Sequence, residues 1–276
     1  MLSLGLDLSE EPARAVVVDD GGDVLARGAG ARAAVAVRAV LQNGQPERAG
    51  VAAVAERKDT TEVAGITAVT RCTPGAAAVA AEGWLGAAKG ARHAIVLVIG
   101  EDVFAGLLLD GKAWTGAHNR AGAAAWLALN PVERQDYRRL GSLAAEVSSK
   151  GIAKRLSWRI QAGDQSRVLD QAGSLEAITG QHVFDGARGG DGVAISVVRD
   201  TARYIGMAVA TLAAAVDPEV IVVGGAVAVA DLMLEPVRQE CARRLPHDAM
   251  ADLRVEFSTL GPDAIAIGAA RLAMLA

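Results

Sequence analysis

The sequence predicts an α/β protein of two lobes, in which a β-meander followed by helices occurs twice. The chain has 276 residues, of which 51% are hydrophobic. A single core stops growing at roughly 250–300 residues, so two lobes are favoured over one. Tight-turn signals join short apolar runs at 20–23 (DGGD) and again at 110–112 (DGK). The second hairpin of this kind indicates a duplicated fold.

The individual elements follow from apolar runs and their boundaries. The runs 2–8, 13–19 and 24–27 are separated by tight turns, which predicts an antiparallel meander. The segment 200–216 places Ile205, Val209, Leu212 and Val216 on one face, as a helix does. The other expected strands are 51–55, 66–70, 93–99, 103–109, 113–115 and 220–223, and the other expected helices are 31–42, 76–89, 143–160 and 264–275.

Bulk properties limit the domain plan and the classes of function. We expect a first lobe at 1–112, completed by a closing helix at 264–276, and a second lobe at 113–263. The net charge of −4 argues against a nucleic-acid surface. Apolar stretches fall short of the ~20 residues of a membrane span, so we expect a cytoplasmic protein. Two cysteines without CxxC spacing argue against disulfides and a cysteine zinc site.

Two hairpins and a strand that ends in Gly224-Gly225 carry the chemistry. A tight loop lets backbone N–H groups point at phosphate oxygens, and a Gly-Gly pair lets a purine lie against the backbone. In order and spacing, these segments resemble the ROK family (repressors, open reading frames and kinases) of the actin-like ATPase superfamily, whose fold is two-lobed and ribonuclease H-like. The matching segments are GLDL (5–8), RAVVVD (14–19), WLGAAKG (84–90), LDGK (109–112), GAH (116–118), 187–191, DPEVIVVGG (217–225) and 261–270.

The resemblance implies a nucleotide site whose phosphate loops are altered here. The nucleotide-binding residues that it implies are Asp7, Gly100, Gly106, Gly224, Gly225 and Ala226. The first loop has SEEP (9–12) where the family has Gly-Gly-Thr-Lys, and the second has GEDVFAG (100–106) where the family has Gly-Thr-Gly-Ile-Gly-Gly-Gly. A carboxylate about 4 Å from a phosphate repels it by about 4 kcal/mol at an effective dielectric near 20. We therefore expect weak binding of ATP.

The acidic residues of these loops have two interpretations. Carboxylate oxygens are ligands that magnesium accepts, so Asp7 and Asp102, with Glu101, are candidate magnesium ligands beside ATP. The alternative is a solvated acidic turn without a metal. The choice between them decides whether the loops attract or repel a nucleotide.

The position of the family's catalytic base is occupied by proline. The resemblance aligns the family's Asn-Asp-Ala-Asn with 73–76 (TPGA), which puts Pro74 where the aspartate accepts a proton from the sugar. No carboxylate occurs between 71 and 81, and the first one after it is Glu82. General-base catalysis contributes typically about 10²–10⁴-fold. We therefore expect no catalytic residue.

The sugar and zinc residues of the family are mostly replaced. Its Gly-Glu-Ile-Gly-His aligns with 122–126 (GAAAW), which removes the sugar-binding Glu and places Trp126 at the zinc-binding His. We expect Trp126 to be a packing residue that fills the volume of the lost site. The segment 130–141 has no cysteine, so we expect no zinc. Glu146 keeps the spacing of the last sugar-binding Glu, and His118 is a second candidate sugar contact. Their alternatives are a surface helix residue and a solvent-facing loop residue.

Three functions remain open at this stage. The first is a catalytically impaired ROK-family homologue that binds a sugar or nucleotide and acts as a ligand-binding or regulatory protein. The second is an ATP-dependent, glucokinase-like sugar kinase with an atypical site. The third is a transcriptional regulator of the same family that lacks its DNA-binding domain; because the first expected strand starts at residue 2, DNA binding by this chain alone is disfavoured. The resemblance also implies a homodimer formed through the second lobe.

Overall fold

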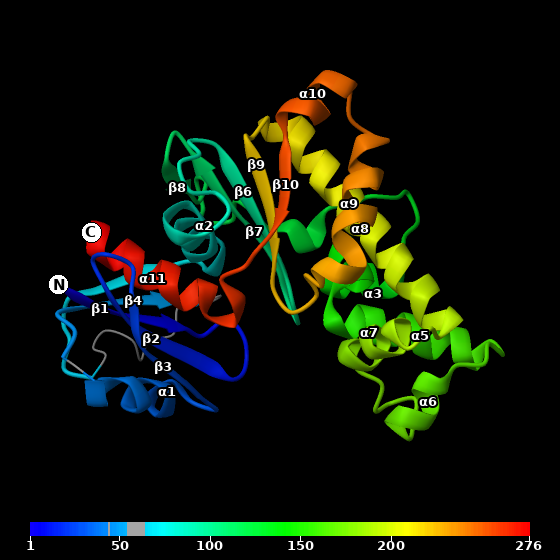
Figure 1. The fold of residues 1–276 in the computed structure, drawn as a ribbon, viewed down its shortest axis with the longest axis horizontal. Coiled ribbons are helices and arrows are strands. Elements are labelled where there is room, and N and C mark those ends of the chain that lie inside the picture. The colour runs from blue at the N-terminus through cyan, green and yellow to red at the C-terminus, as the bar shows by residue number, and fades with distance from the viewer. Residues whose placement is uncertain (44, 54–63) are drawn as a thin grey trace. The chain divides into compact units, whose positions relative to one another are not determined.

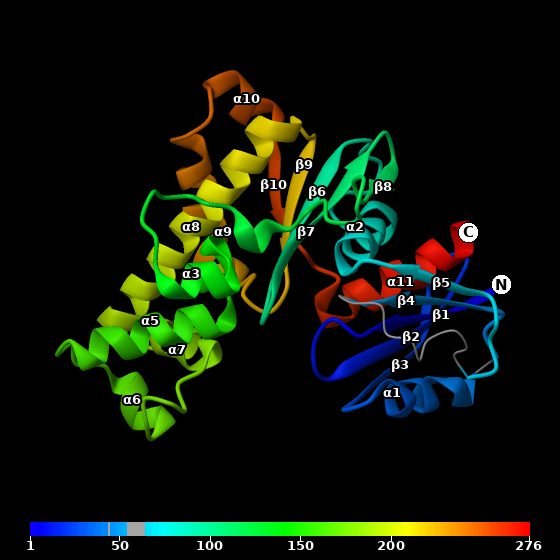
Figure 2. The ribbon, with the colours of Figure 1, turned by 180° about the vertical axis from the view of Figure 1, so that it is seen from behind.

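The computed structural model describes residues 1–43, 45–53 and 64–276. The chain forms two compact units. The first comprises Met1–Val96, Ala105–Gly122 and Ser258–Ala276, and the second comprises Leu97–Phe104 and Ala123–Phe257. Each of the two five-stranded sheets has its own strand order, β3-β2-β1-β4-β5 and β10-β9-β6-β7-β8 (Figures 1 and 2).

The first sheet contains the expected meander. Strand β2 pairs antiparallel with β1 and with β3, and β4 runs parallel to β1 and to β5. The strands are β1 (Leu2–Asp7), β2 (Ala13–Asp19), β3 (Val24–Gly30), β4 (Arg48–Ala52) and β5 (Val69–Cys72). The helices of this unit are α1 (Ala33–Val40), α2 (Pro74–Leu85) and α11 (Ala264–Leu275), with 3₁₀ turns Leu41–Asn43 and Gly261–Asp263.

Helices cover both faces of this sheet. Successive residues of a strand point to opposite faces, so Ala15 and Val17 of β2 pack with α1, whereas Val16 and Val18 pack with α11. Figures 1 and 2 show α1 on one face and α11 on the other. Helix α11 lies directly against the backbone, because a Cβ at Gly5 would lie 1.8 Å from the carbonyl oxygen of Ala266. Only glycine permits so close an approach.

The second sheet leads into the helical part of the second unit. Strands β6 and β7 contribute residues to both units, and β9 runs parallel to β10. The strands are β6 (Ala94–Ile99), β7 (Val103–Leu109), β8 (Lys112–Trp114), β9 (Val220–Gly224) and β10 (Arg254–Phe257). The helices are α3 (Gln135–Leu140), α4 (Ser142–Val147), α5 (Ser149–Gln161), α6 (Arg167–Ala172), α7 (Gly180–Arg188), α8 (Gly192–Val216), α9 (Ala230–Ala242) and α10 (His247–Asp252), with a 3₁₀ turn Ala124–Trp126.

Two helices differ from the sequence-based expectation for local reasons. The helix expected at 143–160 is divided into α4 and α5 at Ser148, which has extended backbone angles and caps α5 by accepting a hydrogen bond from the Gly151 amide at 3.1 Å. The helix expected at 200–216 begins earlier, at Gly192, because Asp191 caps it through the amides of Val193 and Ala194. Part of the strand expected at 51–55, residues 54 and 55, lies outside the described residues.

No helix in the described part of the chain is long and apolar enough to cross a membrane.

Candidate functional site

The first hairpin holds Asp7 in contacts with its own loop. Asp7 ends β1 and is buried. Its Oδ1 accepts hydrogen bonds from the Ser9 amide at 2.9 Å and the Ser9 hydroxyl at 2.6 Å. Burial raises the pKa of Asp7, and the hydrogen bonds from Ser9 offset only part of that effect. The carboxyl group is therefore engaged by Ser9, which stands at the first of the four altered loop positions.

A lysine of α5 pairs with the turn of the second hairpin, and the sequence did not reveal this contact. The Gly100 carbonyl accepts a hydrogen bond from the Ser149 amide at 2.9 Å, which joins the turn to the start of α5. The next residue of that helix, Lys150, places its Nζ 2.6 Å from Oε2 of Glu101. The carboxylate of Glu101 is therefore balanced by a lysine, and the acidic character expected of this turn is reduced.

Asp7 and Asp102, the expected magnesium ligands, lie in different units. Among the residues that the model describes, no group of three or more His, Cys, Asp or Glu side chains is placed to hold a metal ion. Magnesium binding by these residues stays a prediction.

Pro74 occupies the first turn of α2, where a helix accepts proline readily. The preceding Thr73 is the N-cap, and its Oγ1 accepts a hydrogen bond from the Ala76 amide at 3.1 Å. Pro74 itself is buried and has no group that accepts a proton. Glu82 lies near the opposite end of the helix and accepts a hydrogen bond from the Ala87 amide at 2.9 Å. Pro74 itself therefore cannot act as a general base, and the absence of a catalytic residue stays a prediction.

Gly106 has a packing role in the first unit. A Cβ at Gly106 would lie 1.9 Å from the carbonyl oxygen of Gly75, and a Cβ at Gly75 would lie 2.3 Å from that of Ala105. Helix α2 and strand β7 therefore meet backbone to backbone at this point. This contact explains the glycine without a nucleotide, and nucleotide binding by Gly106 stays a prediction.

The expected purine turn follows β9 and lies against the end of β6. Gly224 is buried, whereas Gly225 and Ala226 are exposed. Gly225 has φ +91°, a region that disfavours other residues, and a Cβ there would lie 2.4 Å from the Ile99 carbonyl oxygen. The Val227 amide donates to the same carbonyl at 3.0 Å. Within the second unit, this turn is therefore adjacent to the Gly100 end of the second hairpin.

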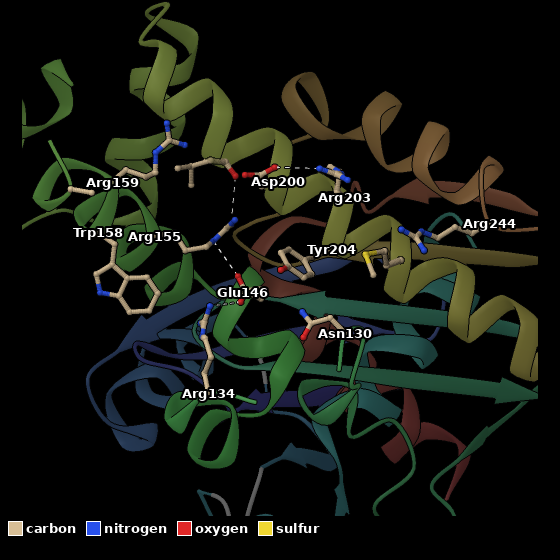
Figure 3. A pocket seen from close by; sticks show the side chains of 13 residues that line it. Asn130, Arg134, Glu146, Arg155, Trp158, Arg159, Asp200, Arg203, Tyr204 and Arg244 are labelled. Carbon is tan, nitrogen blue, oxygen red and sulfur yellow. Dashed lines mark hydrogen bonds and ion pairs between the residues drawn. The ribbon is translucent and has the colours of Figure 1, made fainter. Parts of the chain in front are cut away.

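Glu146 is a buried residue, not a surface one. It belongs to α4 and is 2% exposed. Its Oε1 accepts a hydrogen bond from the Tyr137 hydroxyl and lies 2.8 Å from Nη1 of Arg134. Its Oε2 lies 3.6 Å from Nε of Arg155 (Figure 3). We call Arg134, Tyr137, Glu146 and Arg155 the Glu146 cluster.

Neighbouring charges hold the Glu146 cluster in place. Arg134 also forms a two-point interaction with Asp136, at 3.0 and 2.9 Å, and Nζ of Lys154 lies 3.1 Å from the same carboxylate. The hydrogen bond from Arg134 holds the pKa of Asp136 at about 2. Burial and the hydrogen bond to Glu146 raise the pKa of Tyr137 to about 12. The segment where the family has its zinc loop is thus occupied by charged partners of Glu146.

The remaining sugar and zinc candidates are exposed. His118 lies on an exposed loop of the first unit. Trp126 is 57% exposed, so the expectation that it fills the volume of a lost site is wrong. Its short 3₁₀ turn buries only Ala124.

Sequence reasoning missed Arg134, Tyr137 and Arg155. A usable signal was present, because Glu146 sits in the apolar run 143–147, where a buried carboxylate requires partners.

Comparisons with known proteins identify the family of the chain. The model of the ROK family matches residues 71–275. A glucokinase from Halalkalibacterium halodurans is 33% identical over 192 residues, 68% of this chain and 58% of the relative. The DNA-binding transcriptional dual regulator NagC of Escherichia coli is 25% identical over 162 residues, 58% of this chain and 39% of the relative. The matched region thus spans less than two thirds of either relative.

Solved structures show the same fold. A ROK family glucokinase from Streptomyces griseus, crystallised with glucose and AMPPNP, superposes on this chain over 100% of each chain, with a TM-score of 0.86 and 24% identity. A ROK hexokinase from Thermus thermophilus covers 99% of this chain and 98% of its own, with a TM-score of 0.79 and 24% identity. At these identities the likeness establishes the fold alone.

Proposed function

Because the chain belongs to the ROK family and has its two-lobed, actin-like α/β fold, we propose that it is a sugar-kinase homologue that has lost phosphotransfer and acts as a ligand-binding or regulatory protein. The single observation that carries this proposal is Pro74. It stands at the N-terminus of α2, where the family resemblance places the catalytic base, and it has no group that accepts a proton. No carboxylate lies within a register shift of this position.

The state of Glu146 supports the same proposal. A sugar-binding carboxylate has to offer its lone pairs to sugar hydroxyls. Here Oε1 accepts a hydrogen bond from Tyr137 and forms an ion pair with Arg134, and Oε2 forms an ion pair with Arg155. A sugar would have to displace Tyr137 and Arg134 from Oε1, where one donates a hydrogen bond to the carboxylate and the other forms a close ion pair with it. This loss of sugar contacts adds to the loss of the base.

The ligands of the relatives define what to test. The relatives include glucokinases, and one solved relative holds glucose and an ATP analogue. A sugar and a nucleotide are therefore the first ligands to try, and we expect weak binding of both. The proposal also includes a homodimer and the absence of zinc, which light scattering and metal analysis of the purified protein test directly.

Sugar phosphorylation is the decisive measurement. We expect turnover of glucose and N-acetylhexosamines with magnesium ATP to lie far below the ordinary enzyme range of ~1–10³ s⁻¹. The Pro74→Asp variant should not restore activity, because both phosphate loops remain altered; Pro74→Asn is the matched variant without a carboxylate. Turnover within the ordinary range by the unmodified protein would refute the proposal and establish the alternative, a glucokinase-like enzyme with an atypical site, which the 33% identity favours.

A further inference from the structure

The second unit contains a cavity of about 620 Å³ between α5, α8 and the segment before α3 (Figure 3). This volume lies within the roughly 300–1,000 Å³ of ordinary small-molecule sites. Its lining residues are Asn130, Arg134, Glu146, Arg155, Trp158, Arg159, Ala162, Val197, Asp200, Arg203, Tyr204, Met207 and Arg244. The proposed function assigns no ligand to this cavity, although Glu146 and its two arginines, which it treats as a lost sugar contact, line it.

The lining is rich in positive charge. It contains five arginines and two carboxylates, although the whole chain carries a net charge of −4. The five lining arginines form ion pairs with five carboxylates, and two further cations, Lys154 and Arg243, pair with two of the same carboxylates. These ion pairs therefore join seven cations to five carboxylates. The cations are Arg134, Lys154, Arg155, Arg159, Arg203, Arg243 and Arg244, and the carboxylates are Asp136, Glu146, Asp164, Asp200 and Glu240. An excess of two positive charges remains.

Arg155 is the most deeply placed of these cations. Its side chain is 12% exposed, and its Nη2 donates to the Thr201 hydroxyl. Among the described residues, its buried Nε has no hydrogen-bond acceptor, and Oε2 of Glu146, with which it forms an ion pair, is 3.6 Å away. Burial lowers the pKa of Arg155, which means that its charge is incompletely compensated.

Helix α8 adds a second cation at the rim. Asp200, Arg203, Tyr204 and Met207 have the spacing of one helical face and line the cavity together. The ion pair between Arg203 and Asp200 is long, at 3.8 Å, and the Arg203 side chain is 60% exposed. A weakly held, exposed guanidinium can turn to a ligand at little cost.

Aromatic and apolar groups complete the cavity and favour a ligand with a carbon skeleton. Trp158, Tyr204, Met207, Val197 and Ala162 line it. The guanidinium of Arg134 lies 5.1 Å from the Trp158 ring centroid. A second basic cavity shares this pair of residues and is also lined by Arg138, Arg139 and Lys154, among others.

We propose that the cavity between α5 and α8 is an anion-binding site for a small phosphorylated or carboxylated molecule. Guanidinium groups bind phosphate and carboxylate groups alike, through paired N–H donors. A bound anion would neutralise the remaining positive charge of Arg155, and the Arg203 side chain would contact the anion from the rim. A neutral sugar would leave the charge excess unchanged, so the site selects for charge.

Calorimetric titration with pyrophosphate and with citrate tests the site and separates the two chemistries. We expect binding of at least one probe, weakened by added salt. Arg203→Met should reduce the affinity about tenfold, the worth of one hydrogen bond to a charged group. The matched control is Arg254→Met, which removes an exposed arginine of the same unit that does not line the cavity.

The outcomes are distinct. Binding of pyrophosphate alone identifies a phosphate site, binding of citrate alone identifies a carboxylate site, and either supports the proposal if Arg203→Met weakens it and Arg254→Met does not. Arg155→Met should abolish binding, and circular dichroism shows whether that variant is folded; if it is not, Arg203→Met decides. Absence of binding to both probes at millimolar concentration, or equal losses in the Arg203 and Arg254 variants, would overturn the proposal.

Discussion

Replacement of Glu146 by glutamine tests whether the Glu146 cluster is a structural unit in its own right. The substitution keeps the shape of the side chain and an oxygen that accepts the Tyr137 hydrogen bond. It removes the negative charge that faces Arg134 and Arg155. The variant therefore isolates the charge from the packing.

The expected loss of stability follows from the exposure of the two arginines. Removal of one partner of a buried ion pair typically costs about 3–5 kcal/mol. Arg134 is 30% exposed and keeps Asp136, whereas Arg155 is 12% exposed and loses its ion pair with Glu146. Because only one of the two cations loses its ion pair while buried, we expect the lower end of that range, about 3 kcal/mol.

Urea denaturation followed by tryptophan fluorescence measures this loss. Trp158 reports on the region, because Nζ of Lys154 and the guanidinium of Arg134 lie over its ring. With a slope of about 1–3 kcal/mol per molar urea, the midpoint should fall by roughly 1–3 M. Glu133→Gln is the matched control, since it breaks an exposed pair with Arg138 and should leave the midpoint unchanged. Equal midpoints for Glu146→Gln and the unmodified protein would show that the cluster contributes no net stability.

Two further predictions concern packing and acid stability. Gly106→Ala should destabilise the first unit by about 1–3 kcal/mol or more, because its Cβ would overlap the Gly75 carbonyl; Gly192→Ala, which meets no atom within 4 Å, is the control in thermal unfolding. Asp136, with a folded pKa of about 2, contributes stability that is complete above its unfolded pKa of 3.8 and is lost as the pH falls through the interval to about 2. Asp136→Asn should therefore flatten the pH dependence of stability over that interval, and an unchanged dependence would contradict the assignment.

The parts of the fold set by local chemistry could be predicted from the sequence. The DGGD turn at 20–23 and the apolar runs around it predict the β1-β2-β3 meander, and the structure confirms it. The helix expected from residue 76 begins two residues earlier, at Pro74, since the missing amide of proline is harmless in the first turn of a helix. These features depend on a few neighbouring residues.

The candidate site depends on contacts between residues that are distant in sequence. Lys150 reaches Glu101 only because α5 begins beside the β6–β7 turn. Arg134, which precedes α3, and Arg155 of α5 meet at Glu146, and no local spacing reveals this contact. The division of α4 from α5 at Ser148 was missed because the apolar pattern continues across a serine that caps the second helix.

We propose that nucleotide preference depends on the turn after β9 and its neighbour in the second unit. The exposed Gly225-Ala226 turn is the expected purine contact, and the adjacent Gly100–Asp102 turn has carboxylates where the resemblance places glycine and threonine donors. We expect adenosine to bind at least as well as ATP, the reverse of the usual order for this fold. Calorimetry with both ligands, with and without magnesium, measures the order directly.

A substitution of Lys150 distinguishes the contribution of the phosphate groups to binding from that of the purine. Its ion pair with Glu101, at 2.6 Å, reduces the repulsion that a phosphate group meets at the turn. Lys150→Met should therefore weaken ATP further and leave adenosine unchanged, because the lysine acts on charge and the purine surface is backbone. Tight binding of magnesium ATP with much weaker adenosine would show instead that the acidic turn is a metal site, since a bound cation converts the same carboxylates from a source of repulsion into ligands.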